Sequence, residues 1–166
     1  MSITPLEWFC NSDLKYFASL LPDGTEKIDL VSDFGWEEGY LWEENESINC
    51  NLPNISGIYV VKHLYISEFL YVGESGNIYK RIKNSHTKLS AIIEILRSYS
   101  PLGGFDRDSI ANDLIIYFKE VDKEDFGAPI KRCLIWCEAL TIGILRPIYQ
   151  HNVEDIRNFL ERYGCW

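Results

Sequence analysis

Two short stretches, Gly57-Ile58-Tyr59-Val60-Val61 and Phe69-Leu70-Tyr71-Val72-Gly73, decide the fold of this chain. Both are rich in β-branched and aromatic residues, and a polar segment lies between them, which predicts an antiparallel β-hairpin. Because side chains alternate between the two faces of a strand, we expect Phe69 and Tyr71 on one face of the second stretch. Tyr59 lies at the centre of the first stretch, so the hairpin can present two tyrosines on one surface.

Helical and strand patterns follow the hairpin. The expected elements are a helix over 78–86 capped by Asn77, a helix over 88–98, a strand over 114–118, a helix over 129–145 and a final amphipathic helix over 153–163. The strand over 114–118 is apolar throughout, which predicts burial on both of its faces. Pro147 ends the helix over 129–145 because proline cannot continue a helix.

Residues 1–54 differ in character from the rest of the chain. Apolar residues at helical spacing predict a helix over 4–21, and short strands are expected near 26–31 and 38–42. The acidic run Glu43-Glu44-Asn45-Glu46 indicates a connector. We therefore place a boundary near residue 54. Residues 1–54 form an acidic N-terminal extension packed on the core, 55–152 the principal domain and 153–166 a C-terminal helix.

Charge is unevenly distributed along the chain. The net charge is −9; residues 1–54 contain 11 acidic and 2 basic side chains, whereas residues 55–166 contain 14 of each. Phosphate binding depends mainly on Lys and Arg, so net acidity by itself argues against nucleic-acid binding. The basic cluster lies within residues 77–100, where five basic side chains face only Glu94. These are Lys80, Arg81, Lys83, Lys88 and Arg97.

Neither a membrane anchor nor a disulfide framework is expected. No apolar run approaches the ~18 residues of a membrane span, and the first residues lack a secretory pattern, so we expect a soluble, cytoplasmic protein. The five cysteines include no Cys-x-x-Cys pair. Cys133 and Cys137 lie four residues apart on an expected helix, a spacing that also suits metal chelation. Because no further ligand lies nearby in sequence, we interpret them as small apolar core residues.

Glu138 is the single charged residue in the apolar run from Leu134 to Leu145. Burial of an unpaired carboxylate is costly, so its partner should be a metal ion, an arginine or water at the edge of the run. Arg81 lies at the margin of the apolar side of its own expected helix, aimed along the sheet. Taken alone, Glu138 is explained more simply as a carboxylate at the edge of the apolar run, and Arg81 as a solvated arginine on a helix.

These residues occur in a distinctive order. Gly57-Ile58-Tyr59 is followed after eleven residues by Tyr71-Val72-Gly73, and Arg81 lies ten positions after Tyr71. Glu138 lies in a helix that ends at Leu145-Arg146-Pro147-Ile148-Tyr149. This order resembles the GIY-YIG nuclease family over residues 55–152. The resemblance implies an α+β fold with a small three-stranded, mostly antiparallel sheet flanked by helices, here with an N-terminal α/β extension.

The resemblance also implies a role for each residue. Glu138 would bind one divalent ion, Mg²⁺ or Mn²⁺, which neutralises a phosphate oxygen and the leaving 3′ oxygen. Tyr59 would accept the proton of the attacking water, and it needs help because a phenol has a pKa of about 10. Tyr71 would hydrogen-bond the water or the scissile phosphate. Arg81 would stabilise the charge that develops on that phosphate.

Three positions depart from the family pattern. Members such as the excision-repair incision nuclease have a lysine directly after the second motif, where this chain has Glu74. Many members place His or Tyr four residues after the arginine; here that position is Ser85, and His86 is a candidate substitute. The ending Pro-x-Tyr-Asn has Gln150 in its last position, so the catalytic amide would come from Gln150 or from Asn152.

The leading hypothesis is a metal-dependent endonuclease that hydrolyses nucleic-acid phosphodiester bonds, with DNA as the expected polymer, in restriction, repair or a mobile element. Its phosphate contacts would come from Lys80, Arg81, Lys83 and Lys88. The alternative is a catalytically weak or inactive module of the same fold that binds nucleic acid or a protein. The acidic segment 1–54 also suits a basic protein partner that would supply DNA affinity.

Overall fold

The computed structural model describes residues 2–11, 28–44, 47–84 and 87–150, which form an α+β structure. The strands are β1 (Glu37–Glu44), β2 (Ser47–Cys50), β3 (Gly57–His63), β4 (Phe69–Ser75) and β5 (Leu114–Glu120). All neighbouring strands pair antiparallel in one sheet, in the order β2-β1-β5-β3-β4.

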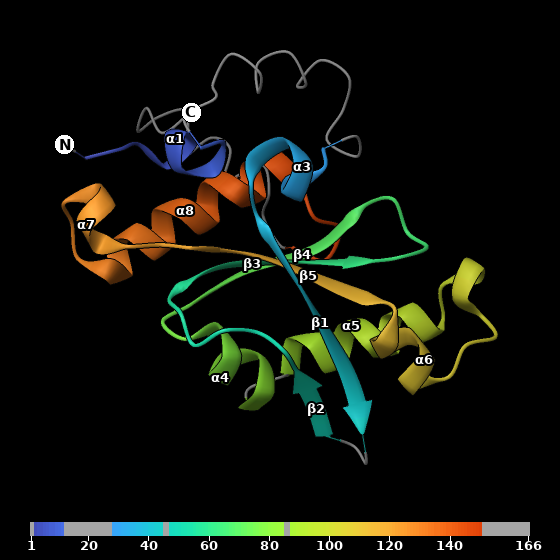
Figure 1. Ribbon diagram of the computed structural model, residues 1–166. Coiled ribbons are helices and arrows are strands. Elements are labelled where there is room, and N and C mark those ends of the chain that lie inside the picture. Colours follow the sequence, from blue (N-terminus) through green and yellow to red (C-terminus); the bar gives the residue numbers. More distant parts are fainter. Residues whose placement is uncertain (1, 12–27, 45–46, 85–86, 151–166) are drawn as a thin grey trace.

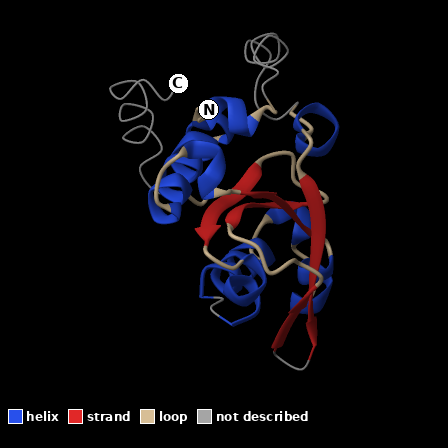
Figure 2. Cartoon of the chain, turned by 60° about the vertical axis from the view of Figure 1, so that its left-hand side comes forward, coloured by secondary structure: helices blue, strands red, loops and turns tan. Residues whose placement is uncertain are grey.

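Helices lie on both faces of this sheet. They are α1 (Pro5–Phe9), α3 (Leu30–Phe34), α4 (Ile78–Asn84), α5 (Thr87–Arg97), α6 (Arg107–Asn112), α7 (Lys123–Phe126) and α8 (Ile130–Leu145). Helices α1, α3, α7 and α8 lie on one side of the sheet, and α4, α5 and α6 on the other (Figure 1). A second view shows the same layers, with the β1–β2 hairpin extending beyond the helices (Figure 2).

The predicted hairpin is present as β3 and β4. Its register pairs Val61 with Tyr71 and then shifts, so that Lys62 pairs with Phe69. The shift is a bulge that inserts Leu70 as an extra residue and reverses the alternation of side chains at this point. Phe69 therefore packs in the core on the opposite face from Tyr71, and the prediction that these two residues share a face is wrong.

β3 is the central strand of the hairpin region because it pairs with both β4 and β5. Gly57 begins this strand, and a Cβ at that position would lie 2.3 Å from the main-chain oxygen of Lys119 in β5. Only glycine therefore lets the two backbones approach closely enough to pair here.

The strand predicted at 114–118 is present as β5, but it is not buried on both faces. Leu114, Ile116 and Phe118 are buried, whereas Ile115 and Tyr117 are only half-buried. The less buried face of β5 is on the same side of the sheet as the exposed Tyr40 of β1, which pairs with Ile115. An antiparallel strand of this kind needs full cover on one face only.

Within the described residues the sheet has five strands, not the three that were predicted, because the N-terminal segment contributes two. β1 pairs with β5, and β2 pairs with β1. Glu43 and Glu44, expected in a connector, are part of β1. The strand expected near 26–31 is also wrong at its described end. There Asp29 caps helix α3 by accepting hydrogen bonds from the main-chain nitrogens of Val31 and Ser32.

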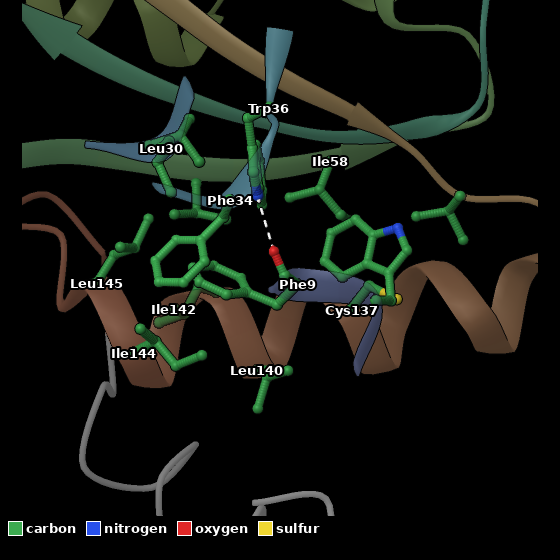
Figure 3. Close-up of a cluster of buried hydrophobic side chains, with 14 of the residues drawn as sticks. Phe9, Leu30, Phe34, Trp36, Ile58, Cys137, Leu140, Ile142, Ile144 and Leu145 are labelled. Atoms are coloured by element: carbon green, nitrogen blue, oxygen red, sulfur yellow. Dashed lines mark hydrogen bonds between the residues drawn. The ribbon is translucent and has the colours of Figure 1, made fainter. Parts of the chain in front are cut away.

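One hydrophobic cluster joins the N-terminal segment to the rest of the chain. Phe9, Phe34 and Trp36 belong to the same cluster as Ile58 of β3 and Leu140 of α8 (Figure 3). The Trp36 indole also donates a hydrogen bond of 3.2 Å to the main-chain oxygen of Phe9. The boundary predicted near residue 54 falls in the connection between β2 and β3.

A second cluster lies on the opposite face of the sheet, where Tyr59, Val61 and Tyr71 pack against α4, α5 and α6. The helices predicted over 78–86, 88–98 and 129–145 are present as α4, α5 and α8. The short helices α6 and α7 were not predicted. The helix expected over 153–163 and most of the one expected over 4–21 lie outside the described residues. None of the described helices is long and apolar enough to cross a membrane.

Candidate active site

Tyr59 and Tyr71 lie together on the face of the sheet covered by α4 and α5. Both side chains are buried, and their ring centroids are 6.2 Å apart with an interplanar angle of 45°. They come from adjacent strands, so the pairing of β3 with β4 fixes their separation. The sequence predicted that these tyrosines could share a surface, and they do.

Gly73 makes room for Tyr59. The two residues pair across β3 and β4, and a Cβ at Gly73 would lie 2.4 Å from the Tyr59 hydroxyl oxygen. The Tyr59 ring therefore crosses directly over the backbone of the neighbouring strand. Any larger residue at position 73 would have to displace this ring.

Arg81 joins the two tyrosines from helix α4. Its guanidinium donates a hydrogen bond to the Tyr59 hydroxyl oxygen and also lies close enough to Tyr71 to interact electrostatically. The helix begins where Asn77 accepts a hydrogen bond of 2.9 Å from the main-chain nitrogen of Lys80. This cap sets the first turn of α4, and hence the direction of Arg81.

Glu138 reaches the same site from α8, in the layer on the other side of the sheet. Burial is the main reason that its pKa rises to about 7, and the negative charge of Glu74 adds to the rise. Arg81 and a hydrogen bond from the main-chain N–H of Glu74 act in the opposite direction. Edge strand β4 lies between the two layers at this point, and Glu74 near its end interacts electrostatically with both Glu138 and Arg81.

The four residues affect one another electrostatically. Burial, and to a lesser extent Tyr71, raises the pKa of Tyr59 to about 12, although the hydrogen bond from Arg81 lowers it. Burial also raises the pKa of Tyr71, and the charge of Glu138 contributes to that rise. At neutral pH both phenols are therefore protonated, while Glu138 is close to its titration midpoint.

Gln150 lies beside this group but has a structural contact of its own. Its side-chain oxygen accepts a hydrogen bond of 3.1 Å from the main-chain nitrogen of Val72 in β4. The main-chain nitrogens of Ile148 and Tyr149 donate to the oxygens of Phe69 and Leu70, each at 3.0 Å. The segment after α8 is thus bound along the outer edge of β4, where no other strand of the described residues pairs.

The predicted phosphate-binding lysines lie on the surface of α4 and α5. Lys80, Lys83 and Lys88 are exposed, and no ion pair involves them in the part of the chain that the structure describes. The Lys83 ammonium donates to the Tyr79 hydroxyl at 2.9 Å. Arg97, the remaining cation of the basic cluster, instead pairs with Glu94 at 3.4 Å.

Two predicted site residues, His86 and Asn152, lie outside the described residues. Cys133 and Cys137 are buried in the core with α8, as interpreted from the sequence. Glu74 was noted from the sequence only as a departure from a pattern. Its position beside Glu138 depends on the packing of α8 against β4, and nothing in the local sequence indicates it.

The donor atoms at this site fit a hard divalent cation. The negative charge of Glu74 lies close enough to raise the pKa of Glu138, and carboxylate oxygen is the ligand type that Mg²⁺ and Mn²⁺ prefer. Among the described residues, no group of three or more His, Cys, Asp or Glu side chains is arranged to hold a metal. Water and phosphate oxygens would have to complete the coordination, as is common for Mg²⁺.

Comparison of the chain with protein-family models, with curated proteins and with solved structures finds no match. The interpretation of this site therefore depends on its own residues and their geometry.

Proposed function

We propose that the chain is a metal-dependent endonuclease of the GIY-YIG type that hydrolyses phosphodiester bonds in DNA. One observation carries the proposal: Tyr59, Tyr71, Arg81 and Glu138 converge from β3, β4, α4 and α8. They are separated by up to 79 positions in the sequence. Within the five-stranded sheet, we assign β3, β4 and β5 with α4 and α8 to the catalytic unit.

Glu138 is the proposed metal ligand. A bound Mg²⁺ or Mn²⁺ would neutralise charge on a phosphate oxygen and on the leaving 3′ oxygen. Burial makes Glu138 a poor place for a negative charge unless a cation is close, which is the behaviour expected of a ligand residue. Glu74 contributes a second negative charge close enough to act on Glu138.

Tyr59 is proposed to orient the attacking water and to accept its proton. Because burial raises the pKa of Tyr59 to about 12, this phenol stays protonated at neutral pH. It can therefore accept a proton only while it passes its own proton to a neighbouring oxygen. The hydrogen bond from Arg81 favours the transient negative charge on the Tyr59 oxygen.

Arg81 and Tyr71 are proposed to bind the scissile phosphate. A guanidinium and a phenol hydroxyl both donate hydrogen bonds to phosphate oxygens, and a charged donor gains strength as negative charge develops in the transition state. Lys80, Lys83 and Lys88 would hold the flanking phosphates on the surface of α4 and α5.

Two contacts favour a second candidate function, a module of this fold that binds nucleic acid without cutting it. Glu74 adds negative charge where the phosphate would bind, and the Gln150 side-chain oxygen already binds the main chain of β4. Such a module would keep the phosphate contacts of the lysines but would not require a metal.

The test is cleavage of supercoiled plasmid and of labelled single-stranded DNA and RNA with Mg²⁺ or Mn²⁺. We expect Glu138→Ala to reduce the rate by roughly 100-fold or more, because the metal ligand is lost. EDTA should abolish cleavage by the wild-type protein. Glu124→Ala, which removes an exposed carboxylate on α7, should cut at the wild-type rate.

Metal-dependent cleavage that Glu138→Ala retains would contradict the assignment of Glu138. Binding of DNA without cleavage of any substrate would reject the nuclease and support the binding module. Absence of both binding and cleavage would reject both functions.

A further inference from the structure

A cavity of about 300 Å³ opens directly beside the four-residue site. Tyr71 belongs to the site and also lines this cavity, so the two adjoin. The other walls come from α5, with Ile92 and Ile95, and from the segment after α8, with Ile148 and Tyr149. The volume is at the lower limit for a small-molecule site, which suits one ring system better than an extended ligand.

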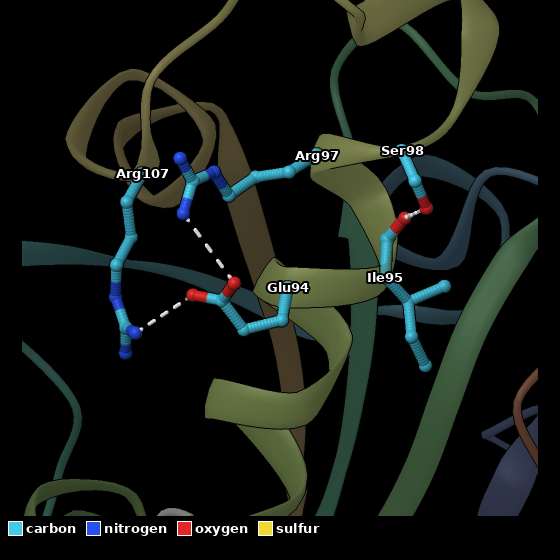
Figure 4. A network of polar contacts seen from close by, with 5 residues as sticks. All are labelled: Glu94, Ile95, Arg97, Ser98 and Arg107. Carbon is cyan, nitrogen blue, oxygen red and sulfur yellow. Dashed lines mark hydrogen bonds and ion pairs between the residues drawn. The ribbon is translucent and has the colours of Figure 1, made fainter.

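Each of the two walls of the cavity makes contacts with other elements of the structure. Main-chain hydrogen bonds from Ile148 and Tyr149 to β4 hold one wall in place. On the other wall, Glu94 of α5 pairs with Arg97 and with Arg107 of α6, at 3.4 and 2.9 Å (Figure 4). The Ile95 side chain points away from these ion pairs (Figure 4). The cavity therefore lies between two elements that each have contacts of their own outside it.

Two of the large aliphatic side chains in this cavity are exposed. Ile95 and Ile148 are each 46% exposed although they are large and aliphatic, and they contribute to the walls of one hollow. Residues with polar side chains are confined to a few positions of the lining, including Lys88 and Gln150. Apolar walls with a few polar groups and one cation suit a flat heteroaromatic ring that is attached to a phosphate.

We propose that this cavity receives one unpaired nucleobase of the substrate, adjacent to the phosphodiester bound by Tyr71 and Arg81. The inference depends on the proposed nuclease function and adds a substrate class to it. Apolar side chains contact the faces of the base, Tyr149 offers an aromatic surface, and Lys88 binds the phosphate of the same nucleotide. A base in a paired and stacked duplex cannot enter, so the substrate is single-stranded or has an unpaired nucleotide at the cut.

The test compares the binding of a short fluorescein-labelled single strand with that of its fully paired duplex. Binding is measured by fluorescence anisotropy in EDTA, in a Glu138→Gln background that prevents cleavage. Ala91→Phe fills the cavity from an exposed position on α5, and Ile148→Ala removes part of the opposite wall. Ile135→Ala is the matched control, because Ile135 on α8 is 48% exposed and lies outside the cavity.

We expect Ala91→Phe to weaken single-strand binding roughly 10-fold, since stacking of one base is lost. Ile148→Ala should weaken it several-fold, Ile135→Ala should not change it, and none of the three should change duplex binding. Thermal melting followed by circular dichroism identifies any variant that fails to fold. If one of the two cavity variants fails to fold, the binding data of the other test the inference.

Equal effects on single strand and duplex, or no effect of the cavity variants, would overturn the inference. If the wild-type protein cuts DNA with Mg²⁺ but the cavity variants cut both substrates at its rates, the cavity inference fails while the nuclease function stands. If the wild-type protein neither binds nor cuts DNA, both fail.

Discussion

Glu138 is the residue whose acid–base behaviour the fold changes most at the candidate site. Its pKa rises from an ordinary 4.5 to about 7, first because of burial and then because of Glu74. The folded protein therefore holds a proton on Glu138 at pH values where the unfolded chain has lost it. Ionised Glu138 destabilises the fold, as expected for a carboxylate in a partly buried position.

Glu138→Gln should stabilise the metal-free protein most at alkaline pH. The folded pKa lies above the unfolded value, so the stability associated with protonated Glu138 is complete below pH 4.5 and is lost as the pH rises through about 7. Glutamine does not titrate. The free energy of unfolding of the variant minus that of wild type should increase by roughly 2 kcal/mol from about pH 5 to about pH 8. Urea unfolding in EDTA at the two pH values measures this difference. An equal difference at both pH values would contradict the raised pKa.

Gly73→Ala should displace Tyr59. The added Cβ would overlap the Tyr59 ring, so we expect a loss of about 1–3 kcal/mol in the free energy of unfolding, together with a loss of cleavage. Gly76→Ala is the matched control at a nearby position, because a Cβ there has no atom within 4 Å. Thermal unfolding of both variants is the measurement. If both melt alike, the tight contact between Gly73 and Tyr59 is not important.

At the scale of elements, α4 presents different residues on its two sides. Ile78 and Ile82 are buried against the sheet, while Lys80 and Lys83 face solvent. Arg81 reaches back to Tyr59 although much of its length is exposed. One short helix therefore carries the proposed transition-state group and two of the proposed phosphate contacts, and its position affects both.

Asn77→Ala should loosen the start of α4. Loss of the bond between the Asn77 side-chain oxygen and the Lys80 main chain costs about 1 kcal/mol in stability at a helix cap. Asn77→Asp keeps a capping oxygen and should recover most of that loss. We expect cleavage to follow the same order, because the cap positions Arg81. Reduced stability with an unchanged cleavage rate would show that the Asn77 cap does not position Arg81 for cleavage.

At the scale of the whole molecule, the acidic segment 1–54 is tied to the rest of the chain by its core residues. The Lys119 ammonium of β5 donates to the main-chain oxygens of Phe9 and Phe34, at 3.5 and 3.4 Å. Burial lowers the pKa of Lys119 to about 8. β1 also pairs with β5, so the N-terminal segment completes both the sheet and one core.

Trp36→Ala should destabilise the whole described fold by about 3–5 kcal/mol, because it leaves a cavity in the core shared by Phe9, β3 and α8. Trp42→Ala is the control for the same substitution at a 40% exposed position of β1, and we expect a change within about 0.5 kcal/mol. Urea unfolding followed by circular dichroism measures both. A separate early transition in Trp36→Ala, with the rest unchanged, would show that the N-terminal segment unfolds independently.

The sequence by itself determined the elements whose signal is local. Periodic apolar residues predicted β3, β4, α4, α5 and α8, and the alternation along β3 and β4 predicted that Tyr59 and Tyr71 share a surface. The order of the polar residues also singled out Arg81 and Glu138. These signals are readable because side-chain direction repeats with the geometry of a single strand or helix.

Only the tertiary structure decided how many strands the sheet has, where the bulge at Leu70 falls, and that Glu74 lies beside Glu138. Each depends on two segments that are distant in sequence. The pairing of β1 with β5 and the packing of α8 against β4 follow from the burial of apolar surface over the entire molecule, which no local pattern records. The pKa of Glu138 is set in the same way, because burial and neighbouring charges exist only once those segments meet.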